Sequence, residues 1–175
     1  MIKQIELNLE TIESMLYLWT ALAEKEKVAE SFFVDVAKQY PLKAIMTKDF
    51  DEESVRKVLS AIQNRELLSG ASKEEKRFWN NNMWMMEDLG VMQAMIDPMK
   101  QLNLQEDEGE LSTKSGFDEV NVIFVPGTTD FFKVVDNNLV VNFFKIAVDI
   151  FGGTGEVTFD GKSLKDAIEE KIKTM

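Results

Sequence analysis

The spacing of apolar residues changes from a helical to a strand period partway along this 175-residue chain. In the first part they recur every three or four residues, as the pattern of an amphipathic helix requires, with Leu9, Ile12, Leu16 and Trp19 as the first example. In the last third they alternate, as in a half-buried strand, for example at Val120, Val122 and Phe124. Helices followed by strands, without βαβ alternation, predict an α+β fold.

The segment between the helical pattern and the strand pattern marks the expected boundary between two halves of the chain. Residues 106–116 carry charge, glycine and serine without an apolar period, which is typical of a loop or linker. We therefore expect a helical half at 1–105 with about four helices and a β-rich half at 117–175 with a small antiparallel sheet and a terminal helix. A chain of this length buries enough surface for one core, so residues 1–175 are predicted to form a single domain.

The stretch FFKVVDNNLVVNFFKI, residues 131–146, is nearly its own mirror image. Antiparallel pairing of similar side chains explains this symmetry. We expect a hairpin with Asn137 and Asn138 in the turn, because asparagine tolerates positive φ, and this places Lys133 opposite Asn142. The face with these two residues also carries aromatic side chains, so we expect the helical half or another subunit to cover it.

Composition excludes several classes of chemistry. The chain has no histidine and no cysteine, which excludes Ser-His-Asp and Cys-His catalysis, thiolate chemistry and the common zinc and iron sites. A net charge of −11 argues against nucleic-acid binding and against attraction to anionic membranes. We find no leader-like segment and no apolar run long enough to span a bilayer, so a cytoplasmic protein is expected.

The segment from Phe78 to Met99, called the Met/Trp segment below, contains six of the ten methionines and two of the three tryptophans. Drawn as one helix, it is apolar around most of its circumference, which indicates burial on several sides. It is interpreted as a core helix with methionine as adaptable filler, and the alternatives are an oligomer interface or a pocket for a small apolar ligand. The candidate binding residues here are Trp79, Trp84, Met85 and Met92.

A polar cluster follows a predicted strand in the β-rich half. Thr128 and Asp130 come after Pro126-Gly127, and Lys133 follows shortly. Hydroxyl and carboxylate groups at a strand end are suited to lining a cleft, although Asp130 can equally cap its own turn. The stretch Gly152-Gly153-Thr154-Gly155 matches neither phosphate-binding motif, and we predict no cofactor.

These features favour a non-catalytic interaction or regulatory protein, forming a homo-oligomer or binding a protein partner through the Met/Trp segment and the aromatic sheet face. The alternative is a small-molecule-binding protein or a histidine-free enzyme. It would use Thr128, Asp130 and Lys133 between helices and sheet, with or without a divalent ion. A third and weaker hypothesis, an acidic inhibitor of a nucleic-acid-binding or toxin partner, requires a concentrated acidic face, and the acidic residues are dispersed along the sequence.

Overall fold

The computed structural model describes residues 1–104, 110–149 and 152–175. In these residues, a short first strand, β1 (Gln4–Asn8), is followed by six helices. They are α1 (Glu10–Ala23), α2 (Glu30–Ala37), α3 (Tyr40–Ala44), α4 (Glu52–Gln63), α5 (Lys73–Glu87) and α6 (Leu89–Lys100). Strands β2 (Glu119–Val125), β3 (Phe132–Val135), β4 (Asn138–Asn142), β5 (Ile146–Val148) and β6 (Val157–Phe159) follow, and the last helix is α7 (Leu164–Lys173). The predicted α+β class is confirmed.

The main sheet is mixed, with strand order β1-β2-β4-β3. Strand β2 pairs in parallel with both β1 and β4, whereas β3 and β4 form the antiparallel hairpin. A second, two-stranded antiparallel sheet joins β5 and β6. The predicted antiparallel pairing is found in the hairpin and in the β5-β6 sheet, whereas the main sheet as a whole is mixed. Its parallel pairs join strands distant in sequence, such as Ile5 opposite Val120, and such pairs leave no local turn signal.

The helical part contains more helices than the four predicted. Pro41 lies in the first turn of α3, where its missing N–H costs nothing. The Met/Trp segment is two helices, because Asp88 ends α5 and caps α6 by accepting a hydrogen bond from the Val91 N–H at 3.0 Å. The linker predicted at 106–116 lies partly outside the described residues.

The hairpin forms with a different register from the predicted one. Lys133 lies opposite Val140, and Val135 lies opposite Asn138, so the turn residues are Asp136 and Asn137. Asp136 adopts the left-handed conformation at φ 53°, which aspartate tolerates better than most residues. The partner of Lys133 thus shifts from 142 to 140, an even number of residues, so each side chain keeps its predicted face.

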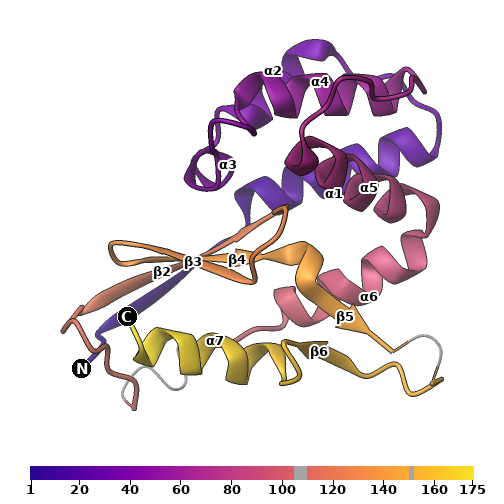
Figure 1. The fold of residues 1–175 in the computed structure, drawn as a ribbon. Coiled ribbons are helices and arrows are strands. Elements are labelled where there is room, and N and C mark those ends of the chain that lie inside the picture. Colours follow the sequence, from indigo (N-terminus) through magenta and orange to yellow (C-terminus); the bar gives the residue numbers. More distant parts are fainter. Residues whose placement is uncertain (105–109, 150–151) are drawn as a thin grey trace.

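The two faces of the main sheet are covered differently. Helix α7 runs beneath the sheet (Figure 1), and buried side chains of that face include Ile5, Val122, Phe124, Leu139 and Val141. Phe131 and Phe132 contact Phe159 of β6 with ring centroids 5.2 Å apart. The chain itself therefore covers the aromatic residues at the start of the hairpin.

The opposite face of the sheet is buried at one end only. Where β2 and β4 end, Val125 and Val140 are buried, and Lys133 donates a hydrogen bond to the Ala44 carbonyl at 2.6 Å. Toward the start of the same strands, Gln4 and Glu6 are exposed and Asn121 is half-buried. Helices α1 to α5 lie toward one end of the sheet (Figure 1), so this face is left open at the other end.

Buried side chains of both halves form one cluster. Trp19 of α1 illustrates the connection: its Nε1 donates to Asn82 Oδ1 of α5 at 2.8 Å, and its ring stacks on Phe143 at 5.6 Å. The single-domain organisation remains a prediction. None of the helices in the described ranges has both the length and the apolar composition that a membrane span requires.

Candidate functional site

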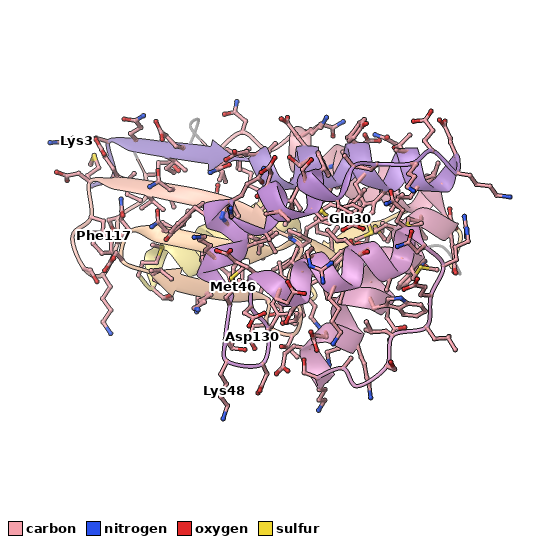
Figure 2. The ribbon with its side chains drawn as sticks, turned by 90° about the horizontal axis from the view of Figure 1, so that it is seen from above. Lys3, Glu30, Met46, Lys48, Phe117 and Asp130 are labelled. Atoms are coloured by element: carbon pink, nitrogen blue, oxygen red, sulfur yellow. The ribbon has the colours of Figure 1, made fainter. Side chains whose placement is uncertain are left out.

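A broad groove lies where the open end of the sheet meets the first helices. Its volume is about 1300 Å³. Strand β1 and its sheet neighbours β2 and β4 form the floor, α1 forms one wall, and α2 and α3 contribute one aromatic residue each. Figure 2 shows α1 continuing in the direction of β1. The groove residues are Gln4, Glu6, Leu7, Asn8, Leu9, Glu10, Glu13, Ser14, Tyr17, Phe32, Tyr40, Asn121, Ile123 and Asn138.

A polar row crosses the floor of the groove from strand to strand. The register places Glu6 opposite Asn121, and Asn121 opposite Asn138. Asn121 Nδ2 donates to Asn138 Oδ1 at 2.9 Å, and Asn138 Nδ2 donates to the Tyr40 hydroxyl at 3.1 Å. These bonds hold the two amides in fixed positions, and the Tyr40 O–H proton is left to donate outward.

The groove carries charge of one sign. Glu6, Glu10 and Glu13 line it, and none of its lining residues is lysine or arginine. Nor does any described lysine or arginine form an ion pair with these three carboxylates. Uncompensated negative charge in a concave surface concentrates the electrostatic field there. Three carboxylates without a cationic partner are thus gathered in one concave surface.

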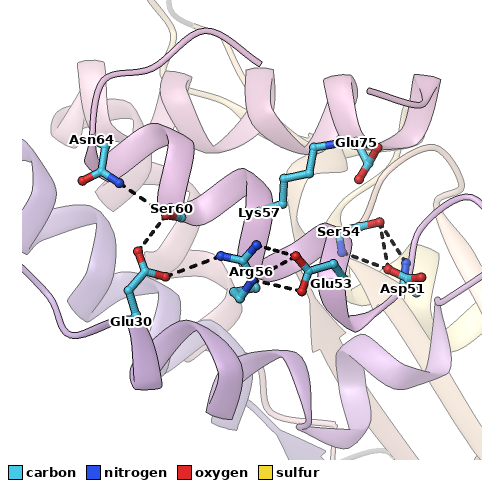
Figure 3. Close-up of polar contacts among 9 residues, drawn as sticks. All are labelled: Glu30, Asp51, Glu53, Ser54, Arg56, Lys57, Ser60, Asn64 and Glu75. Carbon is cyan, nitrogen blue, oxygen red and sulfur yellow. Dashed lines mark hydrogen bonds and ion pairs between the residues drawn. The ribbon is translucent and has the colours of Figure 1, made fainter. Parts of the chain in front are cut away.

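Two carboxylates of α2 and α4 differ from those of the groove, because they have a cationic partner. Figure 3 shows Glu30 of α2 accepting a hydrogen bond from Ser60 of α4 at 2.7 Å and lying 3.8 Å from Arg56. Arg56 also binds Glu53 through its Nε at 3.0 Å. This hydrogen bond from Arg56 is the main reason that the pKa of Glu53 is lowered. Glu30 therefore joins α2 to α4, whereas Glu53 pairs with Arg56 within α4.

Aromatic side chains stand at the wall of the groove. Tyr17 is 56% exposed and Tyr40 is 46% exposed. Tyr17 meets Phe32 edge to face with ring centroids 5.5 Å apart, which joins α1 to α2. Aromatic faces beside carboxylates attract cations, because the ring quadrupole adds to the charge. The groove therefore offers both kinds of contact that a lysine or arginine side chain uses.

The structure brings together three of the residues predicted from the sequence. Thr128, Asp130 and Lys133 line one pocket of about 380 Å³, at the ends of β2 and β4. Figure 2 places Asp130 on the side of Met46 and Lys48, and Ile45 and Thr47 of that loop line the same pocket. The pocket lies between helical residues and the sheet, which is where the sequence predicted a cleft.

The four candidate residues of the Met/Trp segment do not form one site. Met92 is buried in the core at 3% exposure. Trp79 is half-buried, and its Nε1 has no hydrogen-bond partner among the described residues. Trp84, 54% exposed, and Met85 line an apolar hollow of about 260 Å³ beside Phe144 and Ile146. The segment therefore contributes mainly to the core, with Trp84 at the surface.

Sequence reasoning missed the groove entirely, although a signal for it exists. Within β1, polar Gln4, Glu6 and Asn8 alternate with apolar Ile5 and Leu7, the pattern of a strand with one solvated face. Five residues are too few to distinguish this pattern from an irregular start. The closing of the groove by Phe32 and Tyr40 depends on tertiary packing, which leaves no trace in local periodicity.

The described residues contain no group of three or more acidic side chains placed to hold a metal ion. Comparison of the chain with protein families, curated proteins and solved structures finds no match. The functional argument therefore depends on the geometry and charge of the hollows themselves.

Proposed function

We propose that this is a non-catalytic interaction protein that binds a basic segment of a partner protein in the groove between the sheet and α1. The observation that carries the proposal is the one-sided charge of the groove, with Glu6, Glu10 and Glu13 unpaired and no cationic residue in the lining. A lysine- or arginine-rich segment supplies the missing charge, and its side chains are suited to stacking on Tyr17 and Tyr40.

The size of the groove supports a segment of protein rather than a metabolite. Small-molecule sites enclose roughly 300–1000 Å³, whereas the groove measures about 1300 Å³ and is open. The amide row formed by Asn121 and Asn138 offers hydrogen-bonding groups along the floor, and such groups suit the backbone of an extended chain. The overall charge of −11 supports a basic partner and speeds its approach.

The proposal has a direct binding test. A fluorescein-labelled peptide that alternates arginine with serine is titrated with the protein, and fluorescence anisotropy gives the Kd. The triple variant Glu6→Gln, Glu10→Gln, Glu13→Gln is expected to weaken binding by about tenfold or more, equivalent to about 1.4 kcal/mol. The affinity of the natural protein is expected to fall with added salt, because the contacts are exposed charges.

A matched control separates the groove from the general charge of the protein. Glu66→Gln, Glu87→Gln and Glu156→Gln remove the same charge at exposed positions outside the groove. These variants are expected to bind the peptide nearly as well as the natural protein. An equal loss of affinity in both triple variants would show that only net charge attracts the peptide, and the groove would then have no specific role.

The surface around Trp84 is the other candidate contact surface, through which a homo-oligomer was predicted to form. The apolar hollow under Trp84 is small, about 260 Å³, and the other aromatic side chains of the Met/Trp segment lie in or against the core. We therefore propose the groove, rather than the Met/Trp segment, as the main contact surface. Sedimentation of the natural protein and of Trp84→Ser at equal concentration tests whether Trp84 joins two copies.

A further inference from the structure

The pocket at the ends of β2 and β4 has the dimensions and position of a small-molecule site. Strands β2 and β4 are parallel, and crevices beyond the carboxyl ends of parallel strands are common places for ligands. The volume of about 380 Å³ lies within the range of such sites. It is separate from the acidic groove, because the two hollows share no lining residue.

Charges of both signs line this pocket without neutralising one another. Lys133 supplies a cation, and Asp130 and Glu74 supply carboxylates. No ion pair joins Lys133 to either carboxylate, so each nitrogen-to-oxygen distance exceeds the range of direct contact. Lys133 uses one N–H on the Ala44 carbonyl at 2.6 Å, and its other two remain to donate.

Polar groups without charge complete the lining. The hydroxyl oxygens of Thr128 and Thr129 lie 3.3 Å apart and share one hydrogen bond, so together they retain a proton to donate. Asn142, only 4% exposed, accepts the Gly127 N–H at 3.1 Å and the Phe144 N–H at 3.0 Å through its Oδ1. These two bonds fix the amide orientation, and its buried Nδ2 has no acceptor among the described residues.

A buried amide N–H without an acceptor costs free energy, and such groups in native structures call for an explanation such as an absent water or ligand. Asn142 lies so close to Gly127 that a Cβ on that glycine would come within 2.6 Å of the Asn142 side chain. The glycine thus makes room for this amide in the pocket wall. An acceptor oxygen supplied by a ligand would satisfy the Nδ2 N–H.

The remaining wall is apolar, with Phe131 and Phe132 half-buried and Phe50 and Val125 buried. We propose that this pocket binds a free α-amino acid with an apolar side chain. Its carboxylate binds Lys133, the threonine hydroxyls and the Asn142 amide, its ammonium binds Asp130 or Glu74, and its side chain contacts the phenylalanine rings. The separated charges of the pocket match the separated charges of this ligand class.

Calorimetric titration of the full chain with L-leucine, L-methionine and L-phenylalanine tests the proposal. At least one is expected to bind and to raise the Tm with increasing ligand concentration. Its N-acetylated amide, which lacks both charges, is expected not to bind. If none of the three free amino acids binds, or if the uncharged derivative binds equally well, the proposal is overturned.

Variants then assign the charges. Lys133→Met and Asp130→Asn are each expected to weaken binding by about tenfold or more. Asn142→Asp retains the acceptor for the two backbone N–H groups and removes the donor, so it is expected to weaken binding as well. Lys48→Met and Asp35→Asn are the matched controls, since both residues are exposed and lie outside the pocket. If the pocket variants, folded by circular dichroism, bind as the controls do, the amino acid binds elsewhere.

Discussion

Three glutamates of α2, α4 and α5 and the three glutamates of the groove are the same residue type in opposite circumstances. Glu30, Glu53 and Glu75 each have a cationic partner, as Figure 3 shows for the contacts between these helices. Glu6, Glu10 and Glu13 have none among the described residues. The paired set contributes to the stability of the fold, whereas the unpaired set is left available to a partner.

This comparison predicts that the two sets respond differently to mutation. Removing a paired carboxylate breaks existing contacts, so the free energy of unfolding falls. Removing a groove carboxylate breaks few contacts, so stability barely changes while affinity for a basic segment falls. Urea unfolding of single variants measures the free energy of unfolding. Four variants are described below, from the largest expected effect, at Glu75, to the smallest, at Glu6.

The largest effect is expected for Glu75→Ala. Glu75 is 8% exposed, and its Oε1 accepts the Ser72 N–H at 2.8 Å and lies 3.4 Å from Lys57 Nζ. Burial acts to raise the pKa of Glu75, but the Ser72 backbone hydrogen bond and the Lys57 charge outweigh it, so the pKa is lowered. We expect a loss of about 1–3 kcal/mol, because alanine leaves both partners unsatisfied.

Glu75→Gln is the matched variant for this position. Glutamine keeps an acceptor for the Ser72 N–H and removes only the charge opposite Lys57. It is expected to cost less than Glu75→Ala in the same urea titration. Equal losses from the two variants would assign the whole effect to the ion pair rather than to the helix cap.

Asp51→Ala is expected to have the next largest effect. Asp51 caps α4 by accepting the Ser54 N–H at 2.9 Å, and removing such a cap costs about 1 kcal/mol. The same backbone hydrogen bond is the largest cause of the lowered pKa of Asp51. Because the folded-state pKa lies below the ordinary value of 3.8, this contribution is complete above that value and is lost as pH falls through the folded-state pKa.

Urea unfolding at several pH values measures how the stability that Asp51 contributes depends on pH. The difference in stability between the natural protein and Asp51→Ala is expected to be constant near neutral pH and to shrink in acid. A difference that grew on acidification would contradict the assignment of Asp51 as an ionised cap.

Local signals in the sequence were enough to predict the α+β class and a helical first part, but not the number of helices. Ser72 and Glu75 form a capping box at the start of α5, and Ser163 caps α7. The cap of α4 is Asp51, with Ser54 completing the box. Caps are contacts between residues close in sequence, so their signal survives in the sequence alone.

Contacts between distant residues were not predictable in the same way. The pairing of Ile5 with Val120 depends on loop closure across the whole helical part, and this pairing makes the main sheet mixed. The groove was unpredictable for the same reason, because Glu6, Glu13 and Asn138 line one surface only after β1 joins the sheet. Thr128, Asp130 and Lys133 were easier to find, since they lie within a few residues of one another at a strand end.

Arg56→Met is expected to have a smaller effect than either cap. Arg56 contacts Glu53 and Glu30, but its side chain is 37% exposed and those of its partners are 65% and 50% exposed. Exposed ion pairs contribute about 0.2–1 kcal/mol. The loss is expected to diminish at high salt, which screens exposed charges. A salt-independent loss would indicate that the apolar part of the arginine, rather than its charge, holds α2 against α4.

The smallest effect on stability is expected for Glu6→Gln. Among the groove carboxylates without a cationic partner, Glu6 gives the simplest test. Glu10 and Glu13 lie at the start of α1, where negative charge interacts favourably with the helix dipole, whereas Glu6 lies on a strand. Its contact from Gln4 Nε2 at 2.9 Å survives, because the glutamine side chain also has an acceptor oxygen. Neutralising Glu6 lowers the self-repulsion of a chain with net charge −11. We therefore expect a change within about 0.5 kcal/mol, in the direction of greater stability at low salt, together with weaker binding of the arginine peptide. A clear loss of stability would show that Glu6 helps to hold the fold and would place it with the paired carboxylates.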